Sequence, residues 1–238
     1  MATTINKQRL LAQVFAAGKK CGLPAPEARP VLEEFIYGLC RENATPQQAE
    51  RAYRNLRERF FDWNEVRVSS PRELEEAMAG LPGADVRAER LIGFLQEVFE
   101  TKFAFDLEDL QKKGLKVAAK QLGRFQAANE YTCSWVTQRS LGGHAIPVDA
   151  PTLRCTRRLG LVECGPEECE AARATLEHLV PKAKGALFTD AISTLAEEYC
   201  SEEAPNCPAC PLAGECATAQ EAAAVSVPVP RSHRPKPR

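Results

Sequence analysis

Apolar residues recur every three or four positions through most of the chain, the spacing that places side chains on one face of an α-helix. A first amphipathic stretch surrounds Leu10 to Phe15. The same spacing predicts helices over residues 31–40, 46–60, 71–79, 87–99, 107–122, 127–141, 151–161, 166–180 and 184–200. No stretch sustains the apolar-polar alternation of a β-strand, and no internal repeat is visible, so the predicted fold class is all-α.

Capping signals mark where two of these helices begin. Thr45 precedes Pro46, which combines an N-cap residue with proline at the first helical position. Ser70 and Glu73 form the pattern of a capping box around Pro71, and Gly80 ends the short helix that follows.

Length and composition narrow the class of protein. The 238 residues suffice for one large or two small domains. No apolar run approaches the roughly 20 residues of a membrane span, so no membrane association is expected. Gln13, Lys19 and Lys20 interrupt the N-terminal apolar stretch, which argues against a secretory signal. A cytoplasmic location is therefore expected, associated with the nucleoid if the protein is bacterial.

Charge is unevenly distributed, although the net charge is only -1. Residues 111–160 hold nine Lys and Arg against two acidic residues, whereas residues 161–221 hold three against twelve. A basic segment of this kind either attracts phosphates or forms a solvated helix face. Residues 221–238 combine four prolines with basic side chains and predict a disordered tail.

Four cysteines form the strongest local signal. Cys200, Cys207, Cys210 and Cys216 lie within 17 residues, separated by six, two and five residues. Prolines between them oppose helix formation, so the thiols can converge in a loop. The spacing predicts a metal centre, an iron–sulfur cluster in preference to zinc, because structural zinc usually takes two short Cys pairs. The other six cysteines share no spacing and are expected to be ordinary core or surface thiols.

Asp149 follows an apolar stretch and directly precedes a predicted helix that carries Arg154, Arg157 and Arg158. An Asp at this place is typical of an N-cap. The same carboxylate could stabilise a developing cation or position a water molecule while the arginines hold phosphates. The two interpretations are compatible.

The Asp149 segment, followed along the chain by the cysteine loop, resembles the endonuclease III-like branch of the helix-hairpin-helix (HhH-GPD) DNA glycosylase superfamily. That family has a Val-Asp-Thr-His-x-x-Arg stretch, matched here by residues 148–154, and a cysteine loop with the same 6-2-5 spacing. The resemblance spans about residues 27–218 and is specific from residue 131 onward.

The resemblance implies a two-domain fold. Residues 1–35 and 146–220 would form a cluster domain, and residues 36–145 a six-helix barrel. Double-stranded DNA would bind between them, with its target base flipped out of the helix. Asp149 would be the catalytic carboxylate, and Cys200, Cys207, Cys210 and Cys216 would hold a [4Fe-4S] cluster. Arg139, Arg154, Arg157 and Arg158 are the expected DNA contacts.

The chain departs from the family pattern at several positions. Counting back from Asp149 without gaps places residues 125–133 at the hairpin, where both family glycines are missing. Tyr131 replaces the lysine that would form a Schiff base, so lyase chemistry by that route is not expected. Pro151 replaces a histidine, and residues 40–42 offer no clear DNA-wedging residue. Tyr131 either stacks against a flipped base or packs against Trp135.

These observations predict a monomeric, monofunctional base-excision-repair glycosylase acting on a damaged or mismatched base. The altered hairpin, lysine and histidine positions leave open a non-catalytic iron–sulfur relative that binds DNA. The acidic residues 161–221 leave open a third class, a cluster protein unrelated to DNA.

Overall fold

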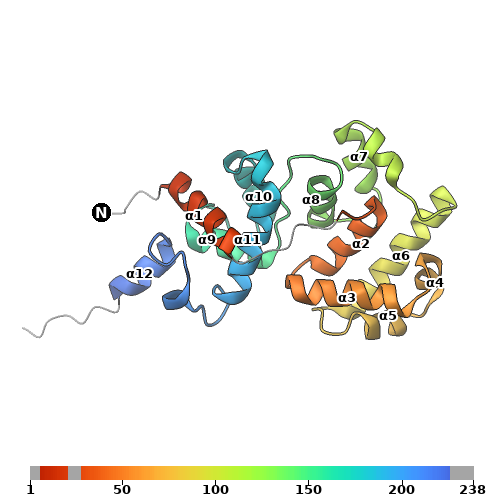
Figure 1. Ribbon diagram of the computed structural model, residues 1–238, viewed down its shortest axis with the longest axis horizontal. Helices are drawn as coiled ribbons and strands as arrows, with labels where there is room; N and C mark the ends of the chain where they lie inside the picture. The colour runs from red at the N-terminus through yellow and green to blue at the C-terminus, as the bar shows by residue number, and fades with distance from the viewer. Residues whose placement is uncertain (1–5, 21–27, 226–238) are drawn as a thin grey trace, which may run out of the picture.

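The computed structural model describes residues 6–20 and 28–225, and every regular element in them is a helix (Figure 1). The predicted all-α class is therefore confirmed. In the same residues, no helix is long and apolar enough to cross a membrane. Most of the predicted tail lies outside the described residues, although residues 221–225 belong to the last helix.

Two separate cores hold the buried apolar side chains. The first core is built by α2 (Val31–Arg41), α3 (Pro46–Arg59), α4 (Trp63–Val68), α5 (Pro71–Ala77), α6 (Ala84–Lys102), the short 3-10 helix η1 (Glu108–Lys112), α7 (Leu115–Leu122) and α8 (Glu130–Arg139). Phe35 and Phe94 lie at its centre, fully buried and stacked with ring centroids 4.0 Å apart.

The second core joins the beginning of the chain to its last third. It is built by α1 (Lys7–Lys20), α9 (Ala150–Leu159), α10 (Cys169–Leu179), α11 (Gly185–Glu198) and α12 (Ala217–Val225), with the 3-10 helix η3 (Cys207–Ala209) packed against it. The 3-10 helix η2 (Lys182–Lys184) connects α10 to α11. Helix α1 packs closely on α11, because a Cβ atom on Gly18 would lie only 2.7 Å from the Cβ of Ala191. Val31 to Phe35 pack in the first core, so assigning all of residues 1–35 to the cluster domain was wrong.

The two cores lie at opposite ends of the molecule, and α8 lies between them (Figure 1). Side chains join them at this junction. The Arg41 guanidinium, at the end of α2, donates to the Ser193 hydroxyl on α11. Arg139, at the end of α8, pairs with Asp190 on α11 at 2.6 Å.

The helix boundaries follow local chemistry. Ser70 forms the predicted capping box with Glu73. Thr45 is the predicted N-cap, and it forms a capping box with Gln48 that was not predicted. The predicted helix over residues 107–122 is instead broken into η1 and α7, because Gly114 interrupts it before Leu115. Helix α4 was not predicted, although Asp62 caps it by accepting from the backbone N–H of Glu65 at 2.8 Å. The first core thus has seven α-helices where six were expected.

Candidate functional site

Asp149 lies at the start of α9, where the second core meets the first. Its Oδ1 accepts from the backbone N–H of Thr152 at 3.0 Å, which makes it the N-cap of α9. Its Oδ2 accepts from the backbone N–H of Asn43 at 3.0 Å. The side chain is anchored on both oxygens, and the residue is 7% exposed. The carboxylate is therefore held in one orientation.

Asn43 completes this arrangement from the turn between α2 and α3. Its backbone has φ of +51°, a left-handed conformation that Asn tolerates better than most residues. Its side-chain Oδ1 accepts from the backbone N–H of Ala150 at 3.1 Å, so Asn43 and α9 bind each other reciprocally. Nothing in the sequence sets Asn43 apart, because an Asn after a helix is common in turns.

Tyr131 lies on the first turn of α8 and is 5% exposed. Its ring stacks on Trp135 with centroids 6.1 Å apart, so the predicted packing contact exists. Burial raises the pKa of the Tyr131 phenol, and the nearby Asp149 carboxylate also raises it, although Arg41 opposes both. Tyr131 is therefore a neutral phenol in the electrostatic neighbourhood of Asp149. Its predicted contact with a flipped base stays a prediction.

A network of buried charges supports this end of α8. The Trp135 indole N–H donates to Glu34 Oε1 at 2.6 Å, and burial raises the pKa of the Glu34 carboxyl. The Arg139 guanidinium lies 4.6 Å from the centroid of the Trp135 ring. Because Arg139 also binds Asp190 and only 6% of its side chain is exposed, it is not on a free surface. The structure does not support the predicted DNA contact of Arg139, which instead joins α8 to α11.

We expect Arg139→Met to destabilise the protein by roughly 3 kcal/mol, because it leaves Asp190 without its partner in a largely buried pair. Thermal unfolding of the variant measures this loss. The double variant Arg139→Met, Asp190→Leu should recover part of it, since no unpaired charge then remains. An Arg139→Met variant of unchanged stability but weaker DNA binding would instead support the predicted contact of Arg139 with DNA.

The turn between α7 and α8 occupies the place of the expected hairpin. It covers residues 123–129, and Gly123 is its only glycine. Gly123 has φ of -68°, which any residue can adopt, so it does not supply the flexibility of the missing glycines. Phe125 instead turns inward and packs edge-on against Phe35 and Phe94, at centroid distances of 6.2 and 5.1 Å. The helix-turn-helix path is present, but an aromatic side chain anchors its turn.

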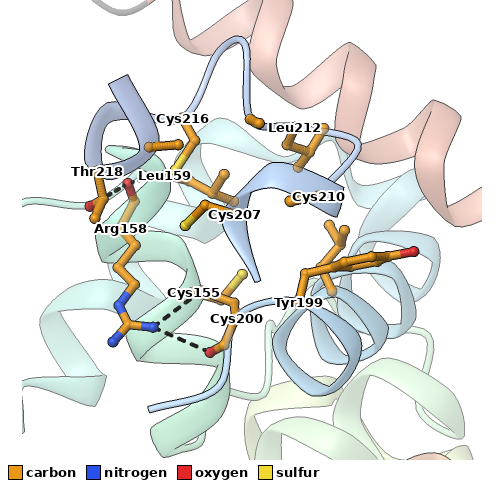
Figure 2. A pocket seen from close by; sticks show the side chains of 13 residues that line it. Cys155, Arg158, Leu159, Tyr199, Cys200, Cys207, Cys210, Leu212, Cys216 and Thr218 are labelled. Atoms are coloured by element: carbon orange, nitrogen blue, oxygen red, sulfur yellow. Dashed lines mark hydrogen bonds between the residues drawn. The ribbon is translucent and has the colours of Figure 1, made fainter. Parts of the chain in front are cut away.

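The four cysteines of the predicted centre line one cavity in the second unit (Figure 2). The remaining walls are mostly apolar, among them Leu159, Leu195, Tyr199 and Leu212, and no carboxylate lines the cavity. Within the described residues, no three His, Cys, Asp or Glu side chains come close enough to hold a single metal ion.

A fifth thiol, Cys155 on α9, lines the same cavity (Figure 2). Cys155 is a buried thiol of the second core, as expected, but it also lies beside the four loop cysteines. Cys21 lies outside the described residues. No local spacing could have revealed Cys155, because it lies 45 positions before Cys200. The neighbouring Cys155 thiol and the Arg158 guanidinium lower the pKa of the Cys200 thiol to about 6, although burial opposes this shift.

Two of the predicted DNA-binding arginines hold the cysteine loop. Arg154 Nε donates to the backbone carbonyl of Cys200 at 2.9 Å. Arg158 donates to the carbonyls of Ser201 and Glu202 at 2.6 and 2.8 Å. Arg157 is exposed. All three arginines line one open groove of about 500 Å³ along α9, which Ala150, the residue after Asp149, also lines.

Comparisons with known proteins point in one direction. No protein-family model matches the chain. DEMETER-like protein 3 of Arabidopsis thaliana is 25% identical over 171 residues, and the DNA glycosylase/AP lyase ROS1 of the same plant is 27% identical over 172. Each alignment covers 65% of this chain but only 16% and 12% of the relative. The chain thus spans a small part of the length of the curated relatives it matches.

Solved structures share the fold over nearly the whole chain. A non-covalent endonuclease III–DNA complex matches with a TM-score of 0.71 at 17% identity, covering 93% of this chain and all of the other. A thermostable thymine-DNA glycosylase matches with a TM-score of 0.66 at 16% identity, covering 90% and 97%. Fold and sequence similarity thus agree, and they confirm the resemblance to the endonuclease III-like helix-hairpin-helix DNA glycosylases.

Proposed function

We propose that this chain is a monofunctional DNA glycosylase that hydrolyses the N-glycosidic bond of a damaged or mismatched base. The observation that carries the proposal is the place of Asp149. In an endonuclease III-like fold, its carboxylate lies where the two units meet, held on both oxygens and adjacent to a groove lined by three arginines.

The held carboxylate suits the chemistry of base excision. As the glycosidic bond breaks, positive charge develops on the deoxyribose. A fixed carboxylate stabilises such a charge without having to reorganise, and it can orient the attacking water. Two backbone N–H groups anchor Asp149 but leave further lone pairs on its oxygens. The base itself would have to be flipped out of the duplex to reach it.

The neighbouring phenol argues for hydrolysis without lyase chemistry. Tyr131 has no amine, so it cannot form an imine with the abasic sugar. Burial also keeps it protonated, as the direction of its pKa shift indicates. The relative ROS1 carries the name of a glycosylase and AP lyase, so the two proteins would differ in this second activity.

The partner we propose is double-stranded DNA, bound by a single copy of the chain. Arg157 is exposed in the last turn of α9, lines the groove beside this helix, and is available to bind a backbone phosphate. Arg154 and Arg158 add positive charge to the same groove while holding the cysteine loop. Glu163 and Glu202 also line this groove, so its charge is mixed.

The cofactor we propose is a [4Fe-4S] cluster held by Cys200, Cys207, Cys210 and Cys216. The donor set fits the group, because thiolates are the usual ligands of such clusters and these four share a cavity without competing carboxylates. Its chemistry would be structural, ordering the loop that Arg154 and Arg158 bind, with a redox contribution if the cluster changes charge.

An excision assay on a lesion panel tests the proposal. Duplexes with single damaged or mismatched bases are incubated with the purified chain, and products are analysed with and without alkali. A monofunctional enzyme releases the base and leaves an abasic site that breaks only in alkali. Strand breaks without alkali would contradict the absence of lyase activity.

A non-catalytic relative is the second candidate function, and the aromatic anchor of the α7–α8 turn favours it. The Phe125 side chain packs against Phe35 and Phe94 in the first core. The turn that carries it lacks the flexible glycines that would let its backbone approach a phosphate. Tight binding to a lesion without release of any base would favour this candidate. In either case, binding to duplex DNA should weaken steeply with added salt.

Tyr131→Lys provides a further prediction. If residue 131 occupies the position of the family lysine, the introduced amine should produce strand cleavage at abasic sites without alkali. Tyr131→Phe is the matched control, because it keeps the stacking on Trp135 and adds no amine. A Tyr131→Lys protein that remains folded and cleaves no more than Tyr131→Phe would show that the register is wrong.

A further inference from the structure

Helix α7 and its flanks carry basic side chains that the candidate site does not use. Lys112 ends η1, Lys116 and Lys120 lie about one turn apart on α7, and Arg124 lies in the turn that follows. These residues recur every four positions, all four are exposed, and residues 111–129 contain no acidic residue. We call Lys112, Lys116, Lys120 and Arg124 the α7 basic stripe.

The charges of the α7 basic stripe have no partner in the part of the chain that the structure describes. No acidic side chain there pairs with any of the four, and none of their side chains forms a hydrogen bond. Lys113, beside them, differs: it pairs with Asp109 at 2.5 Å and donates to Gln121 at 2.8 Å. Because nothing neutralises the four exposed cations, they give this surface a positive potential.

Both ends of α7 are joined to segments that lead to Asp149. At its beginning, Leu115 packs beside Gly143, where an added Cβ atom would lie 2.9 Å from Leu115 Cδ1. Gly143 belongs to the loop that connects α8 to Asp149. At its end, the turn over residues 123–129 leads into α8, where Tyr131 lies in the electrostatic neighbourhood of Asp149. Helix α7 is therefore held in place relative to the candidate site.

The turn after α7 gives a reason for DNA contacts made by side chains. It lacks the glycines that would let its backbone N–H groups approach a phosphate closely, and Phe125 anchors it in the first core. Lysine and arginine reach a phosphate through long side chains, so they need no close approach of the backbone. The α7 basic stripe can thus supply affinity that the backbone of the turn does not.

We propose that the α7 basic stripe binds the phosphate backbone of the duplex whose target base lies at Asp149. The inference rests on the DNA partner of the proposed function, and it names a surface that holds this partner. Four exposed cations can neutralise up to four phosphates. Phosphate contacts position a duplex without reading its sequence, so the α7 basic stripe would contribute to affinity and not to the choice of base.

The double variant Lys116→Gln, Lys120→Gln tests this surface. Glutamine keeps a long side chain and a high helix propensity but carries no charge. Lys116→Arg, Lys120→Arg keeps both charges. Arg51→Gln, Arg59→Gln is the matched control, because it also removes two exposed charges from one helix. That helix, α3, lies on the opposite side of the first core from α7 (Figure 1).

Binding of the full chain to an undamaged fluorescent duplex is measured by anisotropy between about 50 and 200 mM salt, with circular dichroism as the check on folding. At the lowest salt, Lys116→Gln, Lys120→Gln should bind on the order of tenfold more weakly than the wild type. The slope of log K against log salt should be less steep by about 1.8, since each phosphate contact contributes about 0.9. The arginine variant and the α3 control should keep the wild-type slope.

Two results would overturn the inference. The first is a folded Lys116→Gln, Lys120→Gln protein whose affinity and slope equal those of the α3 control. The second is a loss of affinity for only one of two duplexes with unrelated sequences, because a contact with the phosphate backbone affects both equally.

Duplex binding is measured without base excision, so this test is separate from that of the catalytic proposal. A wild type that binds the duplex through the α7 basic stripe but releases no base would contradict the proposed hydrolysis alone. A wild type that binds no duplex would overturn both proposals.

Discussion

Asp149→Asn is expected to lower the rate of base excision by about 10²- to 10⁴-fold, the usual contribution of a positioned acid or base group. The substitution removes the negative charge but changes the shape little. Asn is as good an N-cap as Asp, so α9 should still begin at residue 150. Single-turnover excision on the preferred lesion measures the effect, and equilibrium binding to the same duplex should change far less than the rate.

The structure indicates one side effect of this change. Asp149 Oδ2 accepts from the Asn43 backbone N–H, and an amide nitrogen in that place would face a donor. The cost is about 1 kcal/mol, the scale of one hydrogen bond, and it should appear in thermal unfolding. Asp149→Ser keeps an N-cap oxygen, also removes the charge, and has no amide nitrogen to face that donor.

Asn43→Gly is the matched control for the position of the carboxylate. Glycine accepts the φ of +51° at this place and keeps the backbone N–H that binds Asp149. It loses only the bond from the Asn43 side chain to the Ala150 N–H. We expect a small loss of activity compared with Asp149→Asn. Equal excision rates for wild type and Asp149→Asn would show that Asp149 is not the catalytic carboxylate.

The elements that could be predicted from the sequence are those determined by neighbouring residues. The caps at Thr45 and Ser70 depend on side chains three positions apart, and both form as predicted. Helix α4 has only six residues, too few for a periodic pattern, so only the Asp62 cap could have indicated it. The apolar spacing continues across Gly114, so it predicted one helix over residues 107–122. The backbone helix is nevertheless interrupted at Gly114.

In the candidate site, too, only features determined by neighbouring residues could be predicted. The four loop cysteines could be identified by their spacing, whereas Cys155 belongs to the cavity through the packing of α9, which no local pattern records. Arg139, expected to contact DNA, instead pairs with Asp190, 51 positions away, and only 6% of its side chain is exposed. Contacts between distant segments decide both cases, and only the folded chain reveals them.

Cys210→Ala is expected to reduce the bound iron and sulfide to near background and to destabilise the second core. Binding of a structural metal centre contributes directly to folding, so its loss should cost several kcal/mol. For a chain of this length, about 3 kcal/mol corresponds to a Tm lower by roughly 6–12 °C. Iron and sulfide analysis and thermal unfolding measure the two effects.

The destabilisation should be local. Leu212 and Cys216 of the loop belong to the second core. No residue of the first core, which α2 to α8 build, lines the cysteine cavity. Limited proteolysis of Cys210→Ala should therefore cut first between residues 200 and 216 and leave the first core intact. Cys164→Ala is the matched control, because Cys164 is a half-buried thiol packed against the same core but absent from the cavity. Because only a ligand of the cluster should lose iron when replaced, a Cys210→Ala chain that keeps iron and sulfide at the level of Cys164→Ala would contradict the assignment of these four cysteines.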